Sequence, residues 1–190
     1  MWLEDIHDIL MTHAPDKGVP LVLGASGGLD SQALMQLLAE AGYVRVTCVY
    51  CDHGVRDAED RQKDWERVQQ LATTLGFSAR QEQLTLEAGN FEDCARRARY
   101  ALLHQVREQT GAAWVLTAHH GDDLVESQLL HWMRGSGIAG LVGIKTADYE
   151  RHLLRPLLSV SKATLLAYAQ ETGLSWHEDS TNHQMDRRRN

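Results

Sequence analysis

The residues that most clearly suggest a chemical role form a glycine turn, Ser26-Gly27-Gly28-Leu29-Asp30-Ser31. This turn directly follows an apolar run at residues 20–25. Paired glycines let a backbone approach an anion closely, because no Cβ stands in the way. Apolar residues recur at helical spacing after the turn, so its amides are expected at a helix start, where free N–H groups bind phosphate. The lysine of a Walker-type loop is missing. The turn is predicted to hold a nucleotide's phosphates; an ordinary strand-to-helix turn is the alternative.

Asp30 is the one acidic residue of this turn. A carboxylate beside phosphate is repelled unless a divalent cation lies between them. Mg²⁺ suits that place, because it takes few protein ligands and completes its shell with phosphate oxygens and water. The alternative is a carboxylate that only stabilises the helix N-terminus. We expect Asp30 to hold Mg²⁺ through the phosphates.

A second polar cluster follows another apolar run and contains His119, His120, Asp123 and Glu126. The spacing does not match a zinc motif such as H-E-x-x-H. Asp123 and Glu126 can pair with an ammonium ion, and a histidine can move a proton near neutral pH. A solvated helix start is the alternative for each carboxylate alone. The cluster is predicted to form a pocket for a cationic substrate.

Arginines gather at two places, Arg96, Arg97 and Arg99 in the middle of the chain and residues 187–189 at its end. Arg96 and Arg99 share a helix face with Glu92, so they can bind phosphate or pair with that carboxylate. The terminal arginines can equally be a solvated tail. The net charge of −7 argues against nucleic-acid binding over the whole surface but allows a local basic patch.

Length and composition predict one globular domain over residues 1–190. No apolar run is long enough for a membrane span, and the N-terminus is acidic where a signal peptide would be basic, so a cytoplasmic protein is expected. Cys48 and Cys51 fall in one strand-like run, where residues three apart point to opposite faces. Buried thiols are therefore expected there in preference to a zinc or redox site.

Periodicity predicts helices and strands in alternation. Helices are expected over 2–13, 29–41, 58–75, 90–109 (capped by Asn90), 123–134 (capped by Asp122) and 161–173. Strands are expected over 20–25, 44–51, 78–84 (an edge strand), 112–118 and 152–158, the last of which is a strand or an extended segment. This alternation predicts an α/β, Rossmann-like fold with a five-stranded parallel sheet and helices on both faces. Ligands bind at the carboxyl ends of such strands, so residues 26–31, 52–56 and 119–126 should converge.

Ser-Gly-Gly-x-Asp-Ser at this junction resembles the pyrophosphate loop of the PP-loop ATP pyrophosphatases, which cleave ATP between the α and β phosphates. Further blocks, in order, resemble the N-terminal catalytic domain of the tRNA(Ile)-lysidine synthase family over nearly the whole chain. These blocks are His53-Gly-Val-Arg56, Glu92, Ala95-Arg96, Arg99-Tyr100, Ala118-His-His-Gly-Asp-Asp123, Glu126, Arg134-Gly-Ser-Gly137, Arg155-Pro-Leu-Leu158, Glu178-Asp179, Asn182 and Arg189-Asn190.

The resemblance implies a ligase that forms a C–N bond in two steps, with ATP and Mg²⁺ as cofactors. ATP activates the C2 carbonyl oxygen of the wobble cytidine in a tRNA(Ile) with a CAU anticodon, and pyrophosphate leaves. The ε-amine of free L-lysine then attacks C2, and AMP leaves. The implied partners are this tRNA and lysine, without a membrane. The assembly state is left open, with a homodimer as one alternative.

The resemblance also suggests roles for the residues. The amides of the loop Ser26–Ser31 and a magnesium ion at Asp30 would stabilise the departing pyrophosphate, while His53 and Arg56 would line the nucleotide side. Arg96 would contact the adenylate or the activated cytidine. Asp123 and Glu126 would hold the lysine ammonium ion, and His119 or His120 would accept its proton.

The sequence departs from the family pattern at its end, because the C-terminal tRNA-binding domains typical of the family are absent from residues 1–190. ATP binding is therefore expected to survive better than tRNA modification. Three other functions remain as alternatives: a PP-loop tRNA thiolase, a PP-loop synthetase that adenylates a small molecule, and a non-catalytic adenine-nucleotide-binding module.

Overall fold

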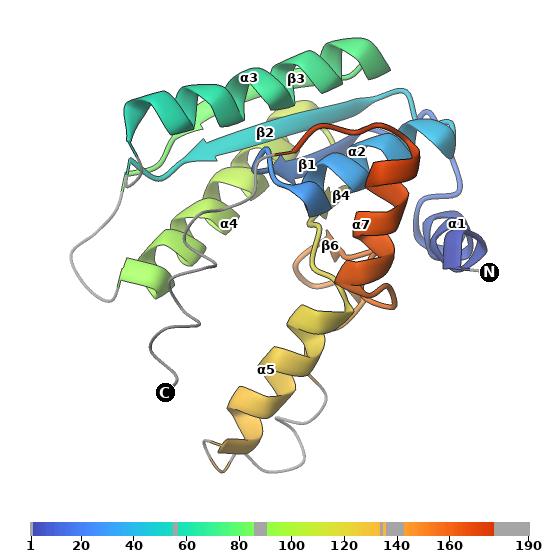
Figure 1. Cartoon of the computed structure of the whole chain (residues 1–190), viewed down its shortest axis with the longest axis vertical. Helices are drawn as coiled ribbons and strands as arrows, with labels where there is room; N and C mark the ends of the chain where they lie inside the picture. The colour runs from blue at the N-terminus through green and yellow to red at the C-terminus, as the bar shows by residue number, and fades with distance from the viewer. Residues whose placement is uncertain (1, 55–56, 86–90, 134, 136–142, 177–190) are drawn as a thin grey trace.

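The computed structural model describes residues 2–54, 57–85, 91–133, 135 and 143–176 (Figure 1). Its helices are α1 (Trp2–His13), α2 (Leu29–Glu40), α3 (Ala58–Leu75), α4 (Phe91–Thr110), α5 (Gly121–Met133) and α7 (Lys162–Glu171). Its strands are β1 (Leu21–Ala25), β2 (Val46–Asp52), β3 (Ser78–Gln83), β4 (Trp114–Leu116), β5 (Ala147–Asp148) and β6 (Leu153–Leu154). None of these helices is long and apolar enough to cross a membrane.

The strands form one sheet in the order β3-β2-β1-β4-β6-β5. All neighbouring pairs are parallel except β5 and β6, which are antiparallel. The predicted α/β fold is thus confirmed, and β3 is the edge strand that was expected. The sheet has one more strand than predicted, the strand β5. It was missed because it is only two residues long. The turn from β5 into β6 uses the positive φ of His152 (48°). Such a short element leaves no periodic pattern in the sequence.

Helices cover both faces of the sheet, as predicted (Figure 1). One apolar cluster includes side chains from α1, α2, α3 and α7, and a second lies under α4. Cys48 belongs to the first cluster and Cys51 to the second, so the two thiols are buried on opposite faces of β2. In contrast, α5 projects away from the sheet, and none of its described side chains is fully buried (Figure 1).

The chain order reverses between β1 and β4. From β1 the chain moves to β2 and β3 on one side, and it then returns to place β4 on the other side. In open α/β sheets such a reversal separates the loops at the carboxyl ends of the two strands and leaves a crevice between them. The turn at 26–31 and the cluster that begins at His119 follow these two strands.

The start of α5 differs from the sequence prediction. Asp122 was expected to cap the helix, but α5 already begins at Gly121, and Asp123 Oδ2 accepts a hydrogen bond from the His120 amide at 2.8 Å. The reason is close packing: Gly121 N donates to Val160 O at 2.8 Å, and a Cβ on Gly121 would lie 3.1 Å from that oxygen. The helix expected to start at Ser161 is confirmed as α7, and Ser161 is its N-cap, because Ser161 Oγ accepts a hydrogen bond from Thr164 N. The predicted cap Asn90 lies outside the described residues.

Candidate active site

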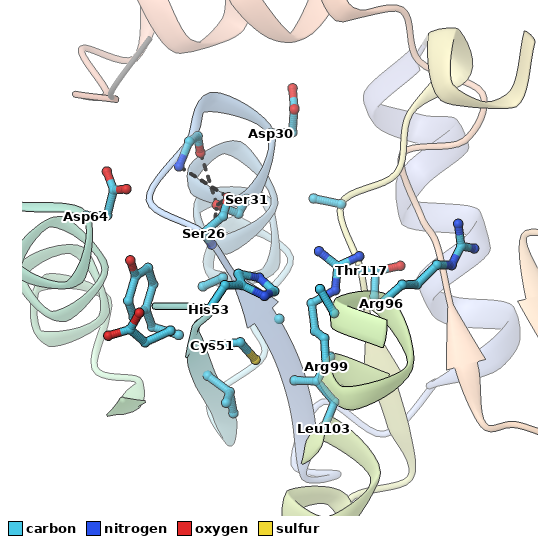
Figure 2. A pocket seen from close by; sticks show the side chains of 18 of the residues that line it. Ser26, Asp30, Ser31, Cys51, His53, Asp64, Arg96, Arg99, Leu103 and Thr117 are labelled. Carbon is cyan, nitrogen blue, oxygen red and sulfur yellow. Dashed lines mark hydrogen bonds between the residues drawn. The ribbon is translucent and has the colours of Figure 1, made fainter. Parts of the chain in front are cut away.

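The turn after β1 is closed by hydrogen bonds within itself (Figure 2). Ser26 N donates to Ser31 Oγ at 3.2 Å, and Ser31 Oγ donates to Gly28 O at 3.0 Å. Gly28 N lies 3.4 Å from Ser26 Oγ. Ser31 is buried in the first turn of α2, so its side chain ties the two ends of the turn together. The turn therefore has a fixed shape before any ligand binds.

Gly27 fixes the position of this turn against α3. Its φ is +77°, a conformation that favours glycine. A Cβ at this position would lie 2.9 Å from the backbone oxygen of Asp64 in α3. Gly27 and Leu29 are buried and do not line the cavity described below. These two predicted contact residues thus shape the turn, whereas Ser26, Gly28, Asp30 and Ser31 face the cavity.

The Asp30 carboxylate has one oxygen without a partner. Oδ1 is buried and has no hydrogen-bond partner among the described residues, while Oδ2 lies 3.7 Å from His120 Nε2. Burial raises the pKa of Asp30, the charges of His120 and Lys162 lower it, and the nearby Asp123 carboxylate raises it. A cation bound at the orphaned oxygen would stabilise the ionised form. The Asp30 side chain thus fits the expected role as a Mg²⁺ ligand.

His119 lies at the opposite wall of the site. Its Nδ1 is 2.8 Å from Thr117 Oγ1, just beyond the end of β4. Burial lowers the pKa of His119 to about 4, against an opposing effect of Asp123, and the charges of Arg155, Arg99 and Arg96 lower it further. The imidazole is therefore neutral at pH 7 and has a free lone pair, but its lowered pKa makes it a weaker base than an exposed histidine.

His120 lies behind this wall, between two carboxylates. It is 5% exposed, and its Nδ1 is 3.6 Å from Asp123 Oδ2 while its Nε2 faces Asp30. It does not line the cavity, whereas His119 does. The two adjacent histidines thus differ in place: one faces the ligand space and the other connects the phosphate turn to α5.

The three loops that were expected to converge do line one cavity, of about 710 Å³. This volume lies within the usual range of small-molecule sites. The described lining includes Ser26, Gly28, Asp30, Ser31, Asp52, His53, Gly54, Thr117, Ala118, His119 and Asp123 from these loops. Glu126 is exposed one turn further along α5 and is not among the lining residues. Arg56 and the side chain of Glu92 lie outside the described residues.

Two arginines of α4 complete the cavity and point in different directions. Figure 2 shows Arg99 reaching toward His53 and Thr117, whereas Arg96 points to the other side of the helix end. Their guanidinium carbons lie 5.8 and 5.7 Å from the ring centre of Tyr100. Both line the cavity, but Arg99, which the sequence offered only as a second phosphate ligand, reaches further into it.

An ion pair that the sequence analysis missed holds the loop after β2. Arg61 of α3 lies 2.6 Å from Asp52 Oδ2, and Asp52 Oδ1 accepts from Gly54 N at 2.8 Å. These contacts position His53, and both charged residues line the cavity. Nothing in the sequence connects residues nine positions apart across a strand end and a helix, so no local signal could have found the pair.

Cys48 and Cys51 are buried, as predicted, and Cys94 is buried too. Burial raises the pKa of Cys51 to about 11 and that of Cys48 to about 12, so both are thiols at neutral pH. Within the described ranges no three His, Cys, Asp or Glu side chains are grouped so that they could hold a metal ion. A Mg²⁺ ion held by one carboxylate and by substrate phosphates needs no such group.

Comparisons with known proteins give the same picture. A model of the PP-loop domain matches residues 4–190. The tRNA(Ile)-lysidine synthase of Bradyrhizobium sp. (strain BTAi1) is 44% identical over 176 residues, which are 88% of this chain and 48% of that protein. The tRNA(Ile)-lysidine synthase of Solibacter usitatus is 36% identical over 166 residues, 87% of this chain and 37% of that protein. The chain therefore spans about half the length of these curated relatives, or less.

A solved structure shares the fold at much lower sequence identity. The U34-tRNA thiolase NcsA from Methanococcus maripaludis, with its [4Fe-4S] cluster, superposes with a TM-score of 0.76 at 14% identity. The match covers 93% of this chain and 66% of the thiolase. At this identity the likeness concerns the fold alone.

Proposed function

This chain belongs to the PP-loop family, and from that premise we propose that it joins lysine to C2 of the wobble cytidine of a tRNA(Ile) with a CAU anticodon. The observation that carries the proposal is the shared cavity, with a phosphate turn and Asp30 on one wall and neutral His119 and Asp123 on the other. Identities of 44% and 36% to lysidine synthases favour this substrate over others of the fold.

In the first step the cytidine O2 attacks the α-phosphorus of ATP, and the bond to pyrophosphate breaks. The amides at the start of α2 face the departing phosphates, and Ser26 and Ser31 hold the turn in shape. Mg²⁺, if held by Asp30, would supply positive charge that stabilises the pyrophosphate. Arg99 reaches toward the same space, so we assign it to the α-phosphate, with Arg96 at the rim toward the cytidine.

In the second step the lysine ε-nitrogen attacks C2, the C2–O bond breaks, and AMP leaves with that oxygen. Lysine arrives as an ammonium ion, which the Asp123 carboxylate can hold at the cavity wall. We assign the proton to His119: if its Nδ1–H donates to Thr117 Oγ1, then Nε2 is free to accept. His120 is a positioning residue, because it connects Asp30 with Asp123 from behind. Glu126 would act from outside the cavity.

The alternatives are less well supported. Cys48 and Cys51 are buried thiols with raised pKa values, which does not favour a thiolase that needs thiolate sulfur at its site. A module that only binds a nucleotide would not need an aspartate and a neutral histidine across from the phosphates. A synthetase acting on a small molecule has no support from the lysidine synthase relatives.

The direct test is incorporation of labelled lysine. The chain is incubated with ATP, Mg²⁺, radiolabelled lysine and a tRNA(Ile) transcript with a CAU anticodon, and label is measured in the RNA. We expect label that depends on ATP, and we expect Asp122→Asn to retain it, since Asp122 is exposed and does not line the cavity. Label in a small molecule, or sulfur transfer in place of lysine transfer, would contradict the proposal.

ATP binding and lysine transfer are two separate expectations for this chain. We propose that residues 1–190 form one catalytic domain and that it acts in the cytoplasm, where tRNA, ATP and free lysine meet. ATP affinity measured beside lysine incorporation separates the two expectations. ATP binding without any incorporation would contradict the proposed lysine transfer.

A further inference from the structure

A second cavity, of about 640 Å³, lies between α4 and the β5–β6 hairpin. It is lined by Asp93, Arg96, Arg97, Tyr100, His104, Arg151, Leu153 and Arg155. Four arginines face one aspartate here, in a chain with a net charge of −7. The arginines come from two segments far apart in the sequence, so the fold concentrates the positive charge. Such a cavity selects an anion.

Arg155 gives the clearest sign that this cavity is built for a ligand. It is 6% exposed, and among the described residues no carboxylate lies within ion-pair distance of it. Its Nη1 donates to Lys145 O at 2.8 Å, but its Nε is buried without a hydrogen-bond partner. A buried, unpaired cation is costly, and a bound anion would remove much of that cost.

Other polar groups of the lining are also available. The hydroxyl of Tyr100 is buried without a partner in the part of the chain that the structure describes. Arg97 is exposed, and its contacts within α4 are long, at 3.4 and 3.5 Å. The Arg151 side chain is 75% exposed, with Asp148 at 4.0 Å. Surface ion pairs of this kind hold a guanidinium only weakly.

The shape of the cavity favours a chain of phosphates over a single small anion. From Asp93 to His104 the lining follows α4 for about 16 Å at 1.5 Å per residue. Leu153 is the only aliphatic side chain among the described lining residues, and the ring of Tyr100 already faces Arg96 and Arg99. The described lining thus offers little to hold a base or ribose, and several guanidinium groups that can hold phosphodiesters.

The position of the cavity indicates whose phosphates it holds. Arg96 lines both this cavity and the candidate active site, so the two adjoin at the start of α4. We propose that the second cavity binds backbone phosphates of the RNA whose cytidine enters the active site. This inference rests on the proposed function for the identity of the RNA, and it adds a site for the part of the substrate that does not react.

The test compares two double variants with matched charge changes. Arg97→Gln/Arg151→Gln removes two exposed guanidinium groups of the cavity. The control, Arg45→Gln/Arg80→Gln, removes two exposed arginines outside both cavities, one just before β2 and one on β3. The probe is an RNA hairpin with the anticodon stem and loop of tRNA(Ile), titrated by fluorescence anisotropy at several salt concentrations. ATP affinity is measured for each protein as a check on the active site.

We expect the cavity variant to bind the hairpin about tenfold more weakly near physiological salt. The steepness of its plot of log K against log salt should fall by about 1.4, because each lost contact to single-stranded RNA contributes about 0.7. The control variant should change affinity less than about twofold, and both should bind ATP normally. Equal losses in the two variants, or no loss, would overturn the proposal. So would a loss of inorganic pyrophosphate binding without loss of hairpin binding, because the occupant would then be a small anion.

The two proposals fail separately. Salt-dependent hairpin binding that requires Arg97 and Arg151, without lysine incorporation, would support the phosphate site and contradict the proposed function. Lysine incorporation with the same KM for tRNA in wild type and cavity variant would support the function and overturn the phosphate site.

Discussion

The two walls of the candidate active site are held in different ways. The phosphate turn is fixed by its own hydrogen bonds, by the buried Ser31 and by the close approach of Gly27 to α3. The opposite wall belongs to the start of α5, a helix without a fully buried described side chain, and it depends on charges around His119, His120 and Asp123. From this difference we propose that the shape of the turn holds the phosphates, whereas charge and proton affinity at the opposite wall hold lysine.

The largest predicted effect is that of Asp30→Asn in the phosphate turn, which should change turnover and stability in different ways. Asp30→Asn should lower turnover by about 10³-fold, since a Mg²⁺ ion that would stabilise the departing pyrophosphate loses its carboxylate ligand. Its folded-state pKa is raised by burial, so the ionised carboxylate costs stability at pH 7, and the variant should unfold at the same or a higher denaturant concentration. Pyrophosphate release and urea unfolding measure the two effects.

Asp122→Asn is the matched control for Asp30→Asn, because Asp122 is exposed in the first turn of α5. It should keep wild-type turnover. Loss of stability in Asp30→Asn with normal turnover would reverse the roles that we give to the turn and would contradict the comparison.

The next effect concerns the charged wall, the side of the site formed by His119, His120 and Asp123, and the pH dependence of the stability that it contributes. The pKa of His119 is lowered to about 4 by burial, below its value in the unfolded chain. The stability linked to neutral His119 is therefore fully present above about pH 6.5 and is lost as the pH falls toward 4, up to about 3 kcal/mol. Urea unfolding at about pH 7 and about pH 4.5 should show a smaller loss for His119→Gln than for wild type.

The control for this measurement is His7→Gln, a substitution of an exposed histidine of α1. It should leave the wild-type pH dependence unchanged. An identical loss of stability in wild type and His119→Gln would mean that His119 is not the buried neutral base that we describe.

A smaller effect tests the shape of the turn. Gly27→Ala should destabilise the fold by about 2 kcal/mol, because alanine is strained at a φ of +77° and its Cβ would meet Asp64. Gly28→Ala should cost less than about 1 kcal/mol, since the φ of Gly28 is −82° and its nearest neighbour would be Ser26 Oγ at 3.4 Å. Equal destabilisation in urea unfolding would argue against a turn fixed by its contact with α3.

The smallest effect ranks the two carboxylates of the charged wall. Asp123→Asn should raise the KM for lysine about tenfold, as expected for loss of a charged hydrogen bond. Glu126→Gln should raise it only about twofold, because Glu126 is exposed and outside the cavity lining. Steady-state kinetics with lysine as the varied substrate decides the order. A larger effect of Glu126→Gln would contradict the assignment of the lysine ammonium ion to Asp123.

Much of the fold could be predicted because long elements leave clear patterns. The apolar run before Ser26 and the periodic leucines after it predicted β1 and α2, and alternation predicted that three loops meet at one edge. Short elements could not be predicted, and neither could which of two adjacent residues takes a given role. Asp122 and Asp123 are equally good helix starters in sequence, and the contact of Gly121 with Val160 decides between them.

The same limit applies to the site residues. Arg96 and Arg99 are three positions apart on α4, and only the three-dimensional structure shows that they point in different directions (Figure 2). Arg155 was part of a recognisable motif, but its sequence context resembled an extended segment and gave no sign that its guanidinium is buried without a carboxylate. Burial and direction depend on packing between distant segments, which local spacing does not encode.

We propose above all that ATP on the turn side and lysine on the α5 side act on the same cytidine. It is tested most directly with ATP labelled in its α-phosphate and tRNA(Ile) in the absence of lysine. We predict that labelled AMP becomes attached to the RNA and that added lysine then releases it as free AMP. Labelled AMP that never joins the RNA, or that leaves it at the same rate without lysine, would contradict the claim.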